Sequence, residues 1–372
     1  MRRYLSLLFA TWAALLLLTA AFTRLIDPYG FWGGPLIDGL NRAKPVAGRH
    51  LIAVKLAQAE RIQPRLMIAG NSRVTVGFDP LSPAWPASVR PVYNMGLAGK
   101  YPEQVADTVI TALDRVRPRE LILGVDLVDF RVAHDKWMGW RGHSPPAASP
   151  VRDRIAMLIS LDALTDSALA IVEQHRRWPA TTTPEGLNPL AEYNAVVADI
   201  GHAGLFDKRI ADNSAKYRAG AKAVAWPEPG TSLAWDSLDR VVAACAKRGI
   251  KLTLVTYPYH VTLLQVFADT GLWPAFEDWQ RRLAAYGNAR DIQVWNFSRI
   301  SPQTAEPVPP PGDTRAQMRW YWEGGHFKSA LGDEMIRELT GQTPPYLGVR
   351  ITPANVESVI AETRARLPRS PR

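Results

Sequence analysis

Short apolar segments alternate with longer amphipathic segments along most of this chain, and this alternation restricts its fold more than any other feature. The short segments have the composition of buried strands and occupy residues 65–70, 89–93, 120–125, 251–257 and 292–297. The longer segments place apolar residues on one helical face, at residues 102–116, 236–248, 276–286 and 331–339. Strands that alternate with helices favour a mainly parallel sheet, because the crossover helices pack on its faces. We therefore predict a three-layer α/β fold.

The N-terminal segment has a different character. An uncharged run from Leu5 to Phe22 follows Met1-Arg2-Arg3. As a helix this run extends about 27 Å, close to the thickness of a bilayer core. We predict a transmembrane anchor over residues 1–25, in the inner (cytoplasmic) membrane, with the two arginines inside and the rest of the chain outside the cytoplasm. A cleaved signal peptide is the alternative, since Leu18-Thr19-Ala20-Ala21 is a mediocre cleavage site.

The remaining boundaries follow composition. Residues 26–61 are expected to form a juxtamembrane linker and a helix, and residues 62–346 the α/β domain. Between about residues 130 and 232 the strand and helix pattern loosens, which predicts an insertion that covers or borders the functional site. Residues 347–372 are expected to form a basic tail.

Charge and cysteine content exclude some classes of function. The formal net charge is +9, but several of the basic residues are terminal. Elsewhere the sequence lacks a dense basic stripe with interleaved aromatic residues, so it does not indicate nucleic-acid binding. The excess of positive charge favours binding to anionic lipid headgroups or envelope polymers. The alternative is that these basic residues only form a solvated surface. The single cysteine, Cys245, allows neither an internal disulfide nor a cysteine-based metal site. The histidines lack the close spacing of helical zinc motifs, so we expect no metal and no cofactor.

Polar side chains follow several predicted strands. Ser72, Asn94, Asp126 and His260 come just after such segments, and His326 precedes a predicted helix. Because ligands of open parallel sheets gather at the carboxyl ends of the strands, we expect these groups to converge there. A serine hydroxyl needs a base to become a nucleophile, which suggests Ser72 as nucleophile and His326 as base.

Each of these assignments has a structural alternative. Glu323 lies three residues before the histidine and is the candidate for orienting it, with Asp313 as a substitute. Ser72 after a strand is also a favoured helix N-cap, and His326 is also suited to capping the helix that follows it.

Three sequence blocks, Gly70-Asn71-Ser72, Tyr93-Asn94-Met95-Gly96 and Glu323-x-x-His326, resemble those of the SGNH (GDSL-type) hydrolase superfamily. The resemblance spans about residues 62–342 and is closest to a membrane-anchored bacterial branch. It implies a flavodoxin-like core and a Ser72, His326, Glu323 triad. It also implies an oxyanion hole formed by the N–H groups of Ser72 and Gly96 and by an asparagine of a third block.

This chain departs from that pattern at the third block, which reads Gly124-Val125-Asp126. An ionised Asp126 beside an oxyanion would raise the reaction barrier. We therefore expect Asp126 to turn away, to be protonated or to have another role, with Asn94 or Asn71 as the missing donor. The departure also favours a weak acyltransferase or a noncatalytic descendant as alternatives.

Five residues near these blocks are candidates for the substrate pocket: Asn71, Arg73, Asp126, His260 and Trp322. Aromatic side chains nearby suit stacking on a sugar ring, although core packing explains most of them equally well: Tyr257, Tyr259, Trp273, Trp279, Trp320, Tyr321 and Trp322.

The prediction is a membrane-anchored, extracytoplasmic serine esterase or O-acyltransferase. It would act on acyl esters, such as acetyl esters, of an envelope polysaccharide or lipid-linked glycan. A noncatalytic glycan-binding or assembly protein is the alternative, and support of a membrane partner is a third hypothesis.

Overall fold

The computed structural model describes residues 1–131, 150–226 and 232–368. Its centre is a six-stranded sheet in the order β2-β1-β3-β4-β5-β8, and every neighbouring pair is parallel except β5 and β8. The strands are β1 (Leu66–Gly70), β2 (Val92–Gly96), β3 (Glu120–Val125), β4 (Lys251–Thr256), β5 (Gln293–Asn296) and β8 (Val349–Ile351). The predicted α/β class with a mainly parallel sheet is confirmed, and the order of the first five strands is flavodoxin-like.

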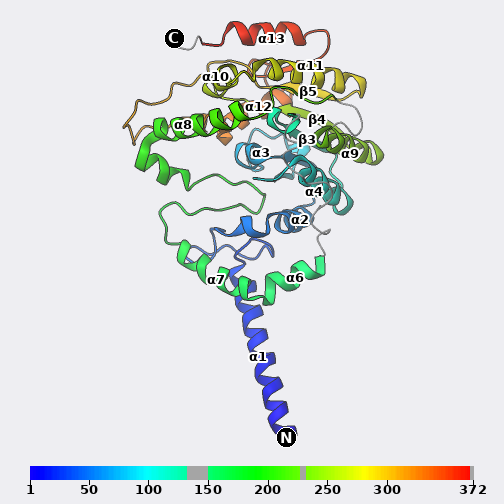
Figure 1. Cartoon of the computed structure of the whole chain (residues 1–372). Coiled ribbons are helices and arrows are strands. Elements are labelled where there is room, and N and C mark those ends of the chain that lie inside the picture. The colour runs from blue at the N-terminus through cyan, green and yellow to red at the C-terminus, as the bar shows by residue number, and fades with distance from the viewer. Residues whose placement is uncertain (132–149, 227–231, 369–372) are drawn as a thin grey trace.

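Helices cover both faces of this sheet (Figure 1). The chain moves one way along the sheet from β1 to β2 and the other way from β2 to β3, so right-handed crossovers place the connecting helices on opposite faces. One layer contains α4 (Pro102–Arg115), α9 (Leu233–Arg248), α10 (Val261–Asp269) and α11 (Trp273–Ala289). The other contains α3 (Ser72–Gly77), which packs against α12 (Ser329–Leu339).

The N-terminal helix α1 (Arg2–Ile26) projects from the domain with most of its apolar side chains exposed (Figure 1). Its mean hydropathy over an eighteen-residue window is 2.1, and it is long and apolar enough to cross a membrane. The residues after α1, the start of the predicted juxtamembrane linker, form a packed loop. The buried Asp27 carboxylate holds this loop by accepting hydrogen bonds from the N–H groups of Phe31, Trp32 and Gly33. Helix α2 (Leu51–Ile62) follows a short 3-10 helix, η1 (Ala47–His50).

The described part of the expected insertion between β3 and β4 lies in two places, while its residues 132–149 and 227–231 are outside the described residues. After η3 (Leu127–Phe130), helices α6 (Pro150–Ile159) and α7 (Leu161–Glu173) pack against α1, and α8 (Tyr193–Ala219) packs against α10 and strand β6 (Tyr321–Glu323). The prediction that the insertion borders the functional site is therefore wrong for α6 and α7. These two helices lie beside the C-terminal end of α1 instead.

The predicted basic tail, residues 347–372, forms part of the domain as far as the structure describes it, up to residue 368. Strand β8 pairs with β5, and α13 (Val356–Ala365) packs on α11. The described residues also form η2 (Ala87–Val89) and a hairpin of β6 with β7 (His326–Phe327).

Candidate active site

The loop after β1 presents the predicted nucleophile. Gly70 ends the strand with φ of +151°, and a Cβ there would come within 2.6 Å of the Tyr257 hydroxyl, so only glycine fits. Asn71 is the N-cap of α3, and its side-chain oxygen accepts a hydrogen bond of 3.0 Å from the Arg73 N–H. The next residue, Ser72, begins the helix, half-buried at the carboxyl end of the sheet.

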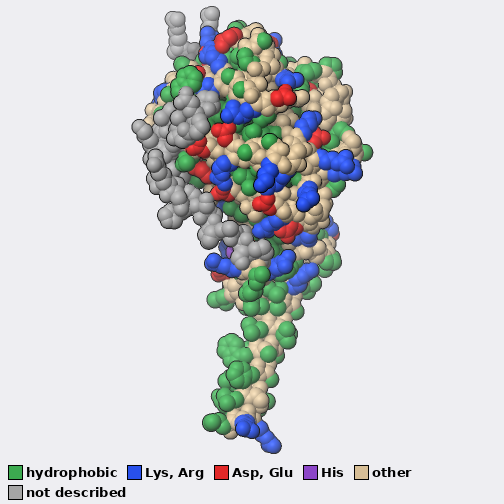
Figure 2. Space-filling view, turned by 90° about the vertical axis from the view of Figure 1, so that its right-hand side faces the viewer, with side chains coloured by type: hydrophobic (Ala, Val, Ile, Leu, Met, Phe, Trp, Pro, Cys, Tyr) green, Lys and Arg blue, Asp and Glu red, His purple; other side chains and the backbone are tan. Residues whose placement is uncertain are grey.

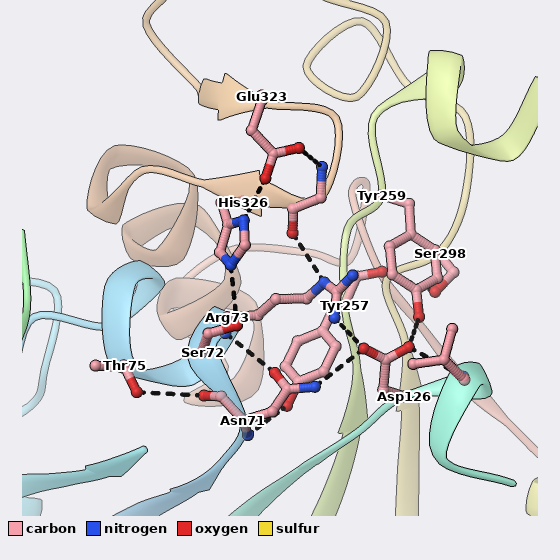
Figure 3. A network of polar contacts seen from close by, with 12 residues as sticks. Asn71, Ser72, Arg73, Thr75, Asp126, Tyr257, Tyr259, Ser298, Glu323 and His326 are labelled. Atoms are coloured by element: carbon pink, nitrogen blue, oxygen red, sulfur yellow. Dashed lines mark hydrogen bonds and ion pairs between the residues drawn. The ribbon is translucent and has the colours of Figure 1, made fainter. Parts of the chain in front are cut away.

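The β6–β7 hairpin brings a histidine to this serine (Figure 3). Nε2 of His326 lies 2.9 Å from Ser72 Oγ, and Nδ1 of the same ring contacts Glu323 Oε1. In the neutral site the serine hydroxyl donates to Nε2, and the Nδ1–H donates to the carboxylate. The structure therefore joins three residues, separated by up to 254 positions, in one relay.

Glu323 is held in its ionised form. It is 2% exposed, and burial alone would raise its pKa. The contact with His326, a 2.7 Å hydrogen bond from the Gly325 N–H and the charge of Arg209 outweigh burial and lower the pKa of Glu323 to about 2. Asp313, the substitute candidate, lies apart from the ring and accepts hydrogen bonds from two N–H groups of its own loop, so that expectation is wrong.

Arg73 connects the nucleophile loop to the histidine hairpin. Its Nε donates a 2.8 Å hydrogen bond to the Gly325 carbonyl, and its Nη1 contacts Asp126. The guanidinium also lies 5.5 and 5.3 Å from the ring centroids of Tyr257 and Tyr259. Burial would lower the pKa of Arg73, but Asp126 and the tyrosines raise it above its usual range, so the side chain is a cation at every working pH.

Asp126 faces this arginine and is fully buried. Besides Arg73, it accepts hydrogen bonds from Asn71 Nδ2 at 3.0 Å, the Tyr259 hydroxyl at 2.6 Å and the Val128 N–H at 3.3 Å. Figure 3 shows the carboxylate on the side of Asn71 away from the serine and histidine. Its negative charge is thus compensated by Arg73, which removes the conflict with an oxyanion.

The expected oxyanion donors Asn94 and Gly96 are not available in this structure. The Asn94 amide donates to the carbonyls of Val74 and Phe78 at 2.7 and 2.8 Å, and its Oδ1 accepts from the Gly96 N–H at 2.9 Å. The buried Asn94 side chain therefore joins β2 to α3, and the prediction that Asn94 and Gly96 donate to an oxyanion is wrong. The backbone N–H of Ser72, by contrast, has no acceptor among the described residues.

Two of the pocket candidates have structural roles instead. His260 caps α10, and its two ring nitrogens contact Thr262 Oγ1 at 3.0 Å and the Glu306 carbonyl at 2.8 Å. Burial lowers its pKa, so this imidazole is held neutral. Trp322 is 8% exposed and packs under Lys328, whose Nζ is 4.1 Å from the ring centroid.

The aromatic residues expected to stack on a sugar are mostly buried. Tyr257, Tyr259, Trp279 and Tyr321 belong to the core, and Trp273 and Trp320 pack against it half-buried. These side chains hold the strand ends and the hairpin in place rather than forming an open platform. Asn71 and Arg73 are the pocket candidates that remain beside Ser72.

Over the described part of the chain, no group of three or more His, Cys, Asp or Glu side chains is arranged to hold a metal ion. The polar groups at the site are the relay of Ser72, His326 and Glu323 and the buried network of Arg73 and Asp126 beside it. No protein-family model matches this chain, and no curated protein is significantly similar to it.

Proposed function

We propose that this protein is a membrane-anchored serine esterase or O-acyltransferase of the SGNH (GDSL-type) hydrolase kind. The observation that carries the proposal is the continuous relay from Ser72 Oγ through both nitrogens of His326 to a buried, ionised Glu323. A serine that served only as a helix cap would not need a histidine oriented in this way.

The relay supports acyl transfer in two steps. His326 Nε2 takes the Ser72 proton as Oγ attacks the ester carbonyl, and the Ser72 N–H donates to the oxyanion that forms. The imidazolium, stabilised by Glu323, then protonates the departing alcohol, which leaves an acyl group on Ser72. Water or an acceptor hydroxyl attacks this ester with His326 again as base, so hydrolysis and transfer differ only in the acceptor.

The length of α1 favours an uncleaved anchor, because its uncharged run from Leu5 to Phe22 is longer than the apolar region of most signal peptides. The C-terminal end of α1 joins the domain: Thr23 and Ile26 are buried, and Lys44 Nζ donates to the carbonyls of Ile26 and Asp27 at 3.1 and 2.8 Å. With Arg2 and Arg3 on the cytoplasmic side, the domain lies outside the inner membrane, where ester-bearing envelope polysaccharides and lipid-linked glycans are its available substrates.

The test is turnover of model acetyl esters by the full-length protein in detergent. We expect hydrolysis by the wild type, loss of it in Ser72→Ala, and no change in Ser358→Ala, which removes a surface hydroxyl of α13. Turnover that persists in Ser72→Ala would refute the proposed nucleophile. A wild-type protein that turns over no ester but binds glycan would instead support a noncatalytic role.

A further inference from the structure

Helices α6 and α7 each carry an apolar stripe that faces solvent. The six residues of these stripes are 37 to 74% exposed, and most are spaced by about one helical turn: Val151, Ile155, Ile159, Leu161, Leu169 and Val172. The exposed faces therefore have the residue spacing of the buried face of an ordinary amphipathic helix, although none of the described residues covers them.

The opposite faces of the two helices are fixed to the domain. Met157 of α6 and Ala163 of α7 are buried in a small core with Tyr29, Phe31 and other residues of the loop after α1. Thr23 Oγ1 of α1 also donates a 2.5 Å hydrogen bond to the Leu158 carbonyl. The pair, which we name the α6–α7 collar (residues 150–173), is therefore rigidly joined to the end of α1.

The position of the collar indicates what covers its stripes. In Figure 1 the two helices lie on either side of the end of α1 at the base of the domain. Figure 2 shows hydrophobic side chains at this base and along α1, with Lys and Arg side chains just above them. The exposed apolar surface is thus continuous with that of the helix that is able to cross a membrane.

The collar is suited to lie on a bilayer rather than to cross it. Its helices are about 15 and 20 Å long, each shorter than the ~30 Å hydrocarbon core. Together they are long and apolar enough for a broken span, but they are bent by 57° relative to each other, and one face of each is buried against the domain. Exposed Arg152 and Arg154 flank the α6 stripe, an arrangement typical of interfacial helices that meet anionic headgroups.

We propose that the α6–α7 collar lies in the interfacial layer of the phospholipid bilayer that α1 enters. The collar then acts as a second membrane contact, and it fixes the tilt of the domain and the height of Ser72 above the lipid surface. The proposal rests on α1 lying in the bilayer, and the experiment below tests that premise separately.

The experiment uses full-length protein in phosphatidylethanolamine and phosphatidylglycerol vesicles. Cys245 is the only cysteine and is buried, so Cys245→Ala provides a background for single cysteines labelled with an environment-sensitive fluorophore. Ile155→Cys and Val172→Cys report on the collar, with Leu161→Cys as a further exposed position should either fold poorly. Leu8→Cys reports on α1, and Leu81→Cys, at a 62% exposed site of the α/β domain, is the aqueous control.

We expect nitroxide lipids to quench the collar labels to an extent comparable with Leu8→Cys, and aqueous iodide to quench them much less than Leu81→Cys. Collar labels quenched by iodide like Leu81→Cys would overturn the proposal. Labels protected from both quenchers would also overturn it, because a second copy of the chain would then cover the stripes. Loss of lipid quenching at Leu8→Cys would refute the membrane premise itself.

Discussion

Replacing Asp126 with asparagine should destabilise the protein strongly, because it leaves Arg73 as a buried cation without its counter-ion. Asp126 is fully buried and the Arg73 side chain is 12% exposed, so little water is available to compensate either charge. Removing one partner of such a pair costs about 3–5 kcal/mol. The new amide group would also face the donors of Asn71 and Tyr259, which adds to the loss.

The assay is equilibrium urea unfolding of the full-length protein in detergent, followed by tryptophan fluorescence. With a slope of about 3 kcal/mol/M, a loss of this size lowers the midpoint by about 1–2 M. Asp129→Asn is the matched control in the same segment. Burial and the neighbouring Asp126 raise the pKa of Asp129 well above its usual range, which favours its protonated form, so an amide there changes the charge of the segment less than an amide at Asp126.

The double variant Arg73→Met, Asp126→Asn should be less destabilised than the sum of its single changes, since the two charges depend on each other. A midpoint in Asp126→Asn that matches Asp129→Asn, or strictly additive effects in the double variant, would refute the reasoning. Where Asp126→Asn still folds, kcat should fall more than KM changes, because Arg73 aligns the Ser72 loop with the Gly325 carbonyl of the histidine hairpin.

Three further changes test separate parts of the structure. Glu323→Gln should lower kcat by about 10³–10⁴-fold, because an amide cannot hold the Nδ1–H form of His326 or stabilise its cation; steady-state kinetics with undiminished kcat would contradict this role. Burial lowers the pKa of Lys55 from 10.5 to about 7, so the unfolded chain binds more protons between these values and stability should rise with pH across this window. The urea midpoint should rise with pH over this window in the wild type and not in Lys55→Met. An equal change of midpoint with pH in the two proteins would refute this role of Lys55. Tyr259→Phe should cost about 1–3 kcal/mol in urea unfolding by removing a donor to Asp126, and an unchanged midpoint would contradict that contact.

The core of the fold was predictable because its signals are local. The runs that become β1, β3 and β4 are buried on both faces, and such strands are apolar throughout. The short strand β8 has no such signal, since it has only three residues with Arg350 at their centre. This pattern cannot be distinguished from that of a polar tail. Its place in the sheet depends on pairing with β5, a contact that sequence periodicity does not record.

The grouping of Ser72, Glu323 and His326 was also expected. Ser72 follows a recognisable strand, His326 precedes a recognisable helix, and Glu323 was proposed from its position three residues before His326. That Asp126 turns away was one of the expected alternatives, but its partners were not expected, since they come from two other segments of the chain: Asn71 and Arg73 at the start of α3, and Tyr259 after β4. The sequence did not predict the orientation of the Asn94 side chain either. An asparagine at a strand end suits a rim donor, and only the nearby carbonyls of Val74 and Phe78 direct its amide inward.

The prediction that α6 and α7 border the site was wrong for a related reason. The periodicity of α6 and α7 reports apolar faces but not what covers them, and the contacts with α1 determine where these helices lie. The loosened pattern that suggested a cover over the site includes α6 and α7, which instead lie at the base of the domain beside α1.

The most direct test of the proposed catalytic relay is site-mapped labelling with a serine-reactive fluorophosphonate. Trypsin releases residues 66–73, in which Ser72 is the only hydroxyl side chain, so a mass increase on this peptide identifies the nucleophile. We predict labelling there in the wild type, none in Ser72→Ala and strongly slowed labelling in His326→Ala. An unmodified peptide in folded wild-type protein, or labelling that is as fast without His326, would contradict the relay.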